Sequence, residues 1–372
     1  MNIITEIEKV PAEQWEQLLH SSMTRSFFQS RECYDLYAAN PEFMTPFCLA
    51  VEDCGRLKGV IVGFVQADGC MAKRYLSRRA IINSGPLLAD DISAEALTLL
   101  LTECKKLLAG KAIYVECRNF EDYTAWREVF EQCGYKYVPH LNFHVDTTSE
   151  NVIDEHLSKS RKKNIRLSFR DGIEVVEQPT IEDVRAFYDV LHHLYQTRVK
   201  TPLYPLSFFE HLYSQPYSYF SLVKFQGKII GGRVCVGLSQ HTLYDWFACG
   251  EDGVYKNIYP SSVATYEALL YGTHNGYLRF DFMGAGKPTE GYGVRDFKAS
   301  FGGSLVEHGR FLLVLNPALY NIGKVGVKAM KGELTQEMGG AILRIFNSCK
   351  RLLPHKYDGG IEKNNNQPKR EG

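Results

Sequence analysis

The chain has 372 residues, which predicts two domains because a single hydrophobic core rarely grows beyond about 250–300 residues. An apolar content of 45% with 23% charged residues excludes a disordered chain. The 43 basic side chains balance 43 acidic ones, so the net charge gives no reason to expect DNA as a partner.

Targeting signals and cysteine spacing are also informative. Residues 1–17 carry acids and no long apolar run, which is unlike a signal peptide, and no apolar stretch is long enough to span a membrane. The ten cysteines occur singly, without a CxxC pair or a Cys/His cluster. We therefore expect a cytoplasmic protein with reduced thiols and no metal site.

The first half of the chain alternates strands and helices. Two apolar runs within 47–66 flank Asp53-Cys54-Gly55, which predicts a hairpin. Ser93 and Gly110 bound an apolar helical pattern. The elements expected after the hairpin are a strand at 80–88, a helix at 93–110, a strand at 112–118, a helix at 123–134 and a strand at 135–146.

The second half repeats this order after a basic helical stretch. The expected elements are the basic helix at 151–172, a helix at 187–199, a hairpin at 219–238, a strand at 241–250, a helix at 261–276 and a strand at 277–283. The hairpin turn Gly55-Arg56-Leu57-Lys58-Gly59 corresponds to Gly227-Lys228-Ile229-Ile230-Gly231. A hairpin followed by strand, helix and strand, present twice, predicts duplication of one α/β unit.

These patterns predict the domain boundaries. We expect one domain at 1–150, a second at 151–325 that carries the active site, and a C-terminal helix with a disordered tail at 326–372. The segment 337–356 has an apolar face with a basic rim. Such a helix either lies on an anionic inner-membrane surface or packs onto the second domain, and both interpretations stay open.

Several segments together resemble the Fem family, the aminoacyl-tRNA-dependent transferases that build peptidoglycan cross-bridges. The segments are FFQSRECYDLY near the start, SKSRKKNIRLS at the domain junction, FDFMGAG followed by GVRDFKASFGG, and FLLVLNPALYNIGK. The resemblance implies an α/β fold of two tandem GNAT-like acyltransferase domains, each with a mixed central sheet between helices. The long coiled-coil arm of some members has no counterpart in this sequence.

The loop at 293–303 holds the residues to which the resemblance gives a catalytic role. In the Fem family a Phe-Lys pair at this place stabilises the oxyanion, and here the pair is Phe297 and Lys298. Acyl transfer to an amine passes through a tetrahedral species, and a fixed cation stabilises its negative charge. The Phe297 ring could hold the ammonium by a cation–π contact. The alternative is a surface lysine beside a core phenylalanine.

Other residues are candidates for substrate binding. The basic cluster with Arg161, Lys162 and Arg166 could bind phosphates of a nucleotide-linked, lipid-linked or tRNA substrate, or it could be a solvated helix face. Asp281 ends a strand where such folds bind ligands, and it could orient an amine or cap the following loop.

The acyl donor is the next question. Acetyl-CoA enzymes of this fold carry a glycine-rich turn before the central helix, whose backbone amides bind pyrophosphate. The corresponding segments, ACGEDGVYKNIYPSS and SGPLLADDISAE, lack that spacing. This favours aminoacyl-tRNA over acyl-CoA as the donor, with no tightly bound cofactor.

The sequence thus predicts transfer of an acyl or aminoacyl group to an amine of a cell-envelope, peptidoglycan-type precursor. One alternative is an acyl-CoA-dependent N-acyltransferase that acts on a sugar or polysaccharide intermediate. The other is a non-catalytic, degenerate GNAT-like binding protein.

Overall fold

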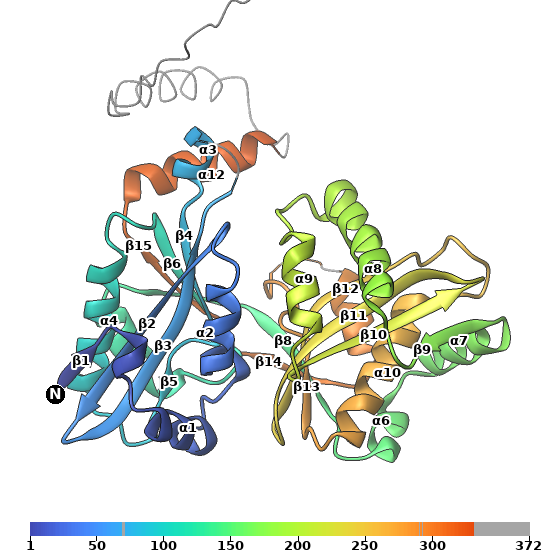
Figure 1. Ribbon diagram of the computed structural model, residues 1–372, viewed down its shortest axis with the longest axis horizontal. Coiled ribbons are helices and arrows are strands. Elements are labelled where there is room, and N and C mark those ends of the chain that lie inside the picture. The colour runs from blue at the N-terminus through green and yellow to red at the C-terminus, as the bar shows by residue number, and fades with distance from the viewer. Residues whose placement is uncertain (69–70, 290, 292, 331–372) are drawn as a thin grey trace, which may run out of the picture. The chain divides into compact units, whose positions relative to one another are not determined.

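The computed structural model of the chain describes residues 1–68, 71–289, 291 and 293–330. Its strands form two mixed sheets with helices on both faces of each (Figure 1). Residues Met1–Pro317, which contain both sheets, form one compact unit. In the described part of the chain, no helix is long and apolar enough to cross a membrane.

The first sheet has the strand order β1-β2-β3-β4-β6-β15-β7, with β5 paired to β3. Its strands are β1 (Asn2–Ile4), β2 (Met44–Asp53), β3 (Arg56–Gln66), β4 (Arg79–Asn83), β5 (Leu87–Leu88), β6 (Tyr114–Arg118), β7 (Lys136–Val138) and β15 (Arg310–Val314). The helices of this half are η1 (Ile7–Lys9), α1 (Ala12–Ser21), η2 (Phe27–Gln29), α2 (Arg31–Ala38), α3 (Met71–Leu76), α4 (Ala94–Leu108), η3 (Thr124–Trp126) and α5 (Arg127–Gln132). Helix α4 packs on one face of β2 and β3, and α1 and α2 pack on the other.

The second sheet has the order β14-β8-β13-β12-β11-β10-β9. Its strands are β8 (Leu141–Asp146), β9 (Ile173–Val176), β10 (Ser218–Phe225), β11 (Lys228–Leu238), β12 (Thr242–Gly250), β13 (Arg279–Asp281) and β14 (Ser304–Glu307). Its helices are α6 (Glu150–His156), α7 (Lys159–Arg170), α8 (Ile181–Leu194), the π-helical turn η4 (Tyr195–Val199), α9 (Leu206–Tyr213), α10 (Pro260–His274) and α11 (Gly293–Ala299). Helices α8 and α9 cover one face and α10 the other.

The two hairpins that suggested duplication have the same turn geometry. Cys54 and Gly55 join β2 to β3 with φ of 48° and 74°, and Gln226 and Gly227 join β10 to β11 with φ of 51° and 75°. Two successive positive φ angles give the tight two-residue turn whose twist matches that of the flanking strands. The structure confirms the expected α/β class and places one such hairpin in each sheet.

Several expected elements differ from the structure. The strand expected at 135–146 is two strands, β7 and β8, that belong to different sheets. Pro139 lies between them, and proline cannot donate to a strand ladder. The basic stretch expected as one helix is α6 and α7, because Ser158 caps a new helix start. The expected loop around Phe297 and Lys298 is the short helix α11.

The domain boundaries at residues 150 and 325 stay predictions, and sheet membership does not follow them. Strand β8 from the first half lies in the second sheet, and β15 from the second half pairs with β6 in the first sheet. Helix α12 (Pro317–Met330) follows β15 and was not expected. The amphipathic segment at 337–356 and the tail lie outside the described residues.

Candidate functional site

The second sheet opens where β12 and β13 part. The two strands pair in parallel from Thr242 and Arg279 to Tyr244 and Asp281. Beyond that point β12 continues to Gly250, whereas β13 ends at Asp281. Ligands of open α/β sheets bind outside the carboxyl ends of parallel strands, so this opening is a candidate site on topology alone.

Lys298 of α11 is fixed beside this opening. Its Nζ donates to the carbonyl oxygens of Phe282 at 2.8 Å and Gly284 at 2.5 Å, and it lies 5.4 Å from the centroid of the Phe282 ring. An ammonium group has three N–H donors, so the bonds to described residues leave one for a ligand. Burial lowers the pKa of Lys298 to about 8, even though the charges of Asp245 and Asp281 act to raise it.

Phe297 has a different partner from the one expected. Its ring holds the guanidinium of Arg161, 4.5 Å from the ring centroid, whereas the Lys298 ammonium lies over Phe282. Adjacent residues of α11 project in different directions, which separates the Phe297 ring from the Lys298 ammonium. The predicted pair is therefore present in the site, but the proposed cation–π contact within it is wrong.

Arg161 joins three elements. Its Nε donates to Ser300 Oγ at 2.9 Å and its Nη1 to Ser262 Oγ at 2.6 Å, so α7 is tied to α10 and to the end of α11. Burial lowers its pKa below the ordinary value, but a guanidinium remains charged in proteins. The structure thus places Arg161 of the predicted basic cluster over the Phe297 ring of α11, and its role in binding stays a prediction.

The remaining members of the basic cluster lie elsewhere. Lys162 and Arg166 are exposed on α7. Among the described residues, neither side chain has a contact that connects it to Lys298. Arg170 pairs with Asp171 at the end of the same helix. An exposed basic helix face fits both alternatives that the sequence left open, a phosphate contact and a solvated surface.

Asp281 is fully buried at the end of β13. Its Oδ1 accepts hydrogen bonds from Asn142 Nδ2 at 2.7 Å and from the Met283 backbone N–H at 2.6 Å. The second bond caps the loop after β13, where Met283 has a φ of 56°. His144 Nε2 lies 3.1 Å from Asp281 Oδ2. Burial alone would raise the pKa of Asp281, but the charges of His144 and Arg279 bring it below the ordinary value.

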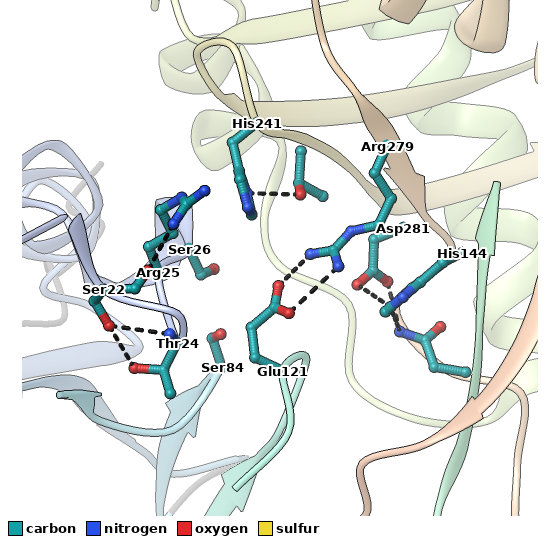
Figure 2. A network of polar contacts seen from close by, with 12 residues as sticks. Ser22, Thr24, Arg25, Ser26, Ser84, Glu121, His144, His241, Arg279 and Asp281 are labelled. Atoms are coloured by element: carbon teal, nitrogen blue, oxygen red, sulfur yellow. Dashed lines mark hydrogen bonds and ion pairs between the residues drawn. The ribbon is translucent and has the colours of Figure 1, made fainter. Parts of the chain in front are cut away.

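A polar network connects this strand to the first half of the chain. Figure 2 shows Glu121, from the segment after β6, pointing toward the guanidinium of Arg279 on β13, with which it forms an ion pair. His144 approaches Asp281 from the neighbouring strand β8 in the same view. His241 contacts Thr242 Oγ1 at 2.9 Å through Nδ1.

Sequence reasoning missed a second ion pair in the site. Arg233 of β11 and Asp245 of β12 form a buried pair, and Arg233 Nε also donates to Thr265 Oγ1 of α10 at 2.6 Å. The arginine lies 5.6 Å from the Phe282 ring and 5.7 Å from the Phe297 ring. The available signal was a charged residue next to an apolar run in each strand, VCVG after Arg233 and WFAC after Asp245.

The N-terminus of α10 is the place where the acetyl-CoA enzymes of this fold bind pyrophosphate. Here Ser261, in the first turn, hydrogen-bonds the carboxylate of Asp252. A helix N-terminus attracts negative charge, and the protein supplies that charge itself. Arg161 hydrogen-bonds Ser262 in the same turn. A CoA pyrophosphate at this helix end would meet the Asp252 carboxylate.

A separate cleft of about 720 Å³ lies between the first half of the chain and the segment around η4. Both halves line it, and its wall is rich in aromatic and amide side chains. Its lining includes Phe43, Gln66, Tyr188, His192, Tyr195, Gln196 and Tyr204. The π-helical turn η4 ends at Lys200, which has a φ of 56°. Single π-helical turns are frequent at functional sites.

Comparisons with known proteins agree with this architecture. A family model of the acetyltransferase (GNAT) domain matches residues 156–298, which include α7, the splayed strands and Lys298. A search of curated protein sequences finds no match. The solved structure of FemX resembles the chain with a TM-score of 0.65 at 15% identity, covering 87% of this chain and 99% of FemX.

Two further solved structures are similar. One is the C-terminal domain of a putative lysylphosphatidylglycerol synthetase from Agrobacterium fabrum, with a TM-score of 0.52, 14% identity and coverage of 86% of this chain and 95% of that one. The other is a tandem GNAT protein from the clavulanic acid biosynthesis pathway, with a TM-score of 0.52, 10% identity and coverage of 85% and 99%. The chain thus has the tandem GNAT fold, and its residues 156–298 match the family model of the acetyltransferase (GNAT) domain.

Proposed function

We propose that this protein transfers an acyl or aminoacyl group to an amine of a cell-envelope precursor of the peptidoglycan type. The observation that carries the proposal is the position of Lys298. Two backbone carbonyls hold its ammonium beside the splayed strands β12 and β13, and one N–H remains for a ligand. The match of residues 156–298 to the acetyltransferase domain supports acyl transfer as the reaction class.

The chemistry follows from that geometry. When an amine attacks an ester or thioester carbonyl, negative charge develops on the carbonyl oxygen. A fixed ammonium stabilises this charge more in the transition state than in the ground state, because the charge is not yet present in the substrate. The carbonyls of Phe282 and Gly284 prevent Lys298 from moving away, so no reorganisation is needed during the reaction. The acceptor itself or a water relay could remove the proton of the attacking amine. Collapse of the tetrahedral species then breaks the bond from the acyl carbon to the ester oxygen or thioester sulfur of the donor, and that leaving group takes up the proton.

Arg161 is the proposed phosphate ligand. A guanidinium has five N–H donors, and the bonds to Ser300 and Ser262 use two of them. The others could bind a phosphate oxygen of the donor or acceptor. Lys162 and Arg166, exposed on the same helix, would add a longer-range attraction for a polyanion such as tRNA. Asp281 would act by fixing the loop that carries the Gly284 carbonyl, rather than by touching substrate.

The charge at the start of α10 favours aminoacyl-tRNA over acyl-CoA as the donor. Asp252 lies where a CoA pyrophosphate would need a positive or neutral surface. The solved structures similar to this chain include FemX and a putative lysylphosphatidylglycerol synthetase, which agrees with aminoacyl transfer. An acyl-CoA donor for a sugar acceptor is the alternative, and it requires a pyrophosphate site away from α10.

The aromatic cleft of about 720 Å³ is the proposed acceptor site. Aromatic rings stack on sugar and peptide groups, and the amides of Gln66 and Gln196 can hydrogen-bond their polar edges. We place the reaction in the cytoplasm, with a peripheral contact to the inner membrane if the acceptor is lipid-linked. A non-catalytic protein would use the same cleft only for binding.

The experiment titrates the full chain with aminoacyl-tRNA, acetyl-CoA and a UDP-linked muropeptide. Binding is detected as a shift in the melting temperature of the protein. The proposal predicts saturable binding of tRNA and muropeptide, and weaker tRNA binding by the Arg161→Ala variant. Binding of acetyl-CoA alone would identify the acyl-CoA alternative. Binding of a ligand without any turnover would identify the non-catalytic alternative.

A further inference from the structure

Arg233, which pairs with the buried Asp245, lies near the same ring as Lys298. Phe282 follows directly after β13, and its ring centroid is 5.4 Å from the Lys298 Nζ and 5.6 Å from the Arg233 guanidinium. Asp245 directly follows Tyr244, the residue at which the pairing of β12 with β13 ends. The ion pair therefore sits at the point where the strands part, next to Phe282, whose carbonyl oxygen accepts a hydrogen bond from Lys298.

Among the described residues, only one carboxylate oxygen of Asp245 accepts a hydrogen bond. Arg233 Nη1 donates to its Oδ2, and Thr265 fixes the same arginine through a bond of 2.6 Å to Nε. The other carboxylate oxygen, Oδ1, is buried and has no hydrogen-bond partner among the described residues. A buried carboxylate oxygen without a donor lowers the stability of the fold, so its presence in a site calls for a functional reason.

We propose that Asp245, fixed by Arg233 and Thr265, is a positioning residue that keeps the Lys298 ammonium charged where the strands part. The inference rests on the proposed function in one respect only, that the charged ammonium stabilises an oxyanion. A lysine that stabilises an oxyanion must carry its proton, and a buried ammonium loses its proton easily unless a carboxylate compensates it. Asp245 supplies that compensation without a hydrogen bond that would occupy the last N–H donor of Lys298.

The charges that face Lys298 come from three strands. Asp245 on β12 and Asp281 on β13 act to raise its pKa, and Arg233 on β11 acts to lower it together with burial. Asp281 already accepts bonds from Asn142 and the Met283 N–H, and it lies within ion-pair distance of His144. Each of the two carboxylates has one oxygen without a hydrogen-bond partner among the described residues, and Asp245 is the larger influence on Lys298.

The test measures the titration of Lys298 directly and needs no substrate. Trace acetic anhydride labels unprotonated lysines, and mass spectrometry of the Lys298 peptide across a pH series gives its pKa in the folded, full-length protein. In Asp245→Asn we expect this pKa to fall by about 1–3 units, the effect of a nearby opposite charge. An unchanged or higher value would overturn the proposal.

Glu121→Gln is the matched control, because Glu121 is also a buried carboxylate paired with an arginine, Arg279. We expect the Lys298 pKa to stay at its wild-type value in this variant. An equal fall in Glu121→Gln would show a general effect of losing a buried carboxylate and would contradict a specific role for Asp245.

Loss of structure cannot imitate the expected result, because exposure raises a lysine pKa toward its ordinary value of 10.5. Asp245→Ser provides a second neutral side chain of smaller size, and it must show the same fall if the charge is the cause. Where transfer activity is measured, the pH above which the transfer rate declines should be lower in both variants, by the same number of pH units as the pKa of Lys298. A wild-type protein without transfer activity contradicts the proposed function, whereas the labelling result still decides the role of Asp245.

Discussion

The guanidinium of Arg161 lies 4.5 Å from the centroid of the Phe297 ring, so α7 and α11 meet through a cation–π contact. The same guanidinium hydrogen-bonds Ser262 at the start of α10. Residues more than one hundred positions apart in the sequence thus meet around the Arg161 guanidinium. This meeting point is where we propose that Arg161 contacts a phosphate of the substrate.

Replacing Arg161 tests that contact. Arg161→Ala should weaken binding of a phosphate-bearing ligand such as tRNA by about 10- to 100-fold, the loss expected for one charged hydrogen bond. Arg161→Lys keeps the charge but loses the planar fork and the stacking on Phe297, so we expect an intermediate value. Filter-binding titrations measure the Kd. Lys106→Ala, on the exposed side of α4, is the control, and an equal loss in that variant would contradict a specific contact.

The rate of transfer should fall as the pH rises. Lys298 has a pKa of about 8, lowered from 10.5 by burial, and the proposed mechanism needs its protonated form. Activity should therefore be retained below pH 8 and decline above it, and kcat across a pH series measures this. In Lys298→Arg the guanidinium does not titrate in this range, so any remaining activity should persist to higher pH. A decline at the same pH in that variant would assign the titration to another group.

The ion pair of Glu121 and Arg279 should stabilise the fold. It connects β13 of the second sheet with the segment after β6 of the first, and both side chains are largely buried. Arg279→Met leaves a buried, uncompensated carboxylate and should cost about 3–5 kcal/mol, whereas the double variant Glu121→Leu/Arg279→Met should recover part of this. Urea unfolding gives the free energies. A double variant less stable than the single one would contradict this account.

The partly buried histidines His241 and His308 should make the fold sensitive to acid. Burial lowers the pKa of both His241 and His308 from 6.5 to about 4. Between these pH values the unfolded chain binds protons that the native state does not, so stability falls as the pH is lowered from 6.5 to 4. The melting temperature across this range measures the effect. His308→Gln should reduce the slope, and an unchanged slope would assign the effect to other groups.

Phe28 should be a strong contributor to the core that both halves share. It is fully buried, and its ring lies 5.4 Å from that of Tyr244 and 5.1 Å from that of Trp246, measured between centroids. Phe28→Ala should cost about 3–5 kcal/mol through the cavity that it leaves. The exposed Phe169 is the control, because its replacement by alanine should have little effect on urea unfolding.

Much of the fold could be predicted from local patterns. The hairpin turns at Cys54-Gly55 and Gln226-Gly227 and the helix capped by Ser93 follow from turn and capping chemistry that lies within a few residues. The exchange of β8 and β15 between the sheets could not be predicted, because strand pairing depends on contacts between distant segments. Proline at position 139 marked the break between β7 and β8 but not the change of sheet.

The residues of the site that belong to a recognisable sequence motif could be predicted. The Phe-Lys pair came from the resemblance and Arg161 from the basic cluster at 160–170, and the structure places the Arg161 guanidinium over the Phe297 ring. The ring that each cation contacts depends on the direction of side chains on α11, which spacing alone does not give. Arg233 and Asp245 were missed because each is a charged residue within a mostly apolar strand, and only the sheet register pairs them.

The most direct test of the account is the rate of acyl transfer by Lys298 variants. In a single-turnover assay with labelled aminoacyl-tRNA and an amine acceptor, Lys298→Ala should lower the rate by about 100- to 1,000-fold, the effect of removing one fixed group that stabilises an oxyanion. Circular dichroism would establish that the variant keeps its fold. A folded Lys298→Ala protein that transfers at the wild-type rate would contradict the role of Lys298 and with it the proposed site.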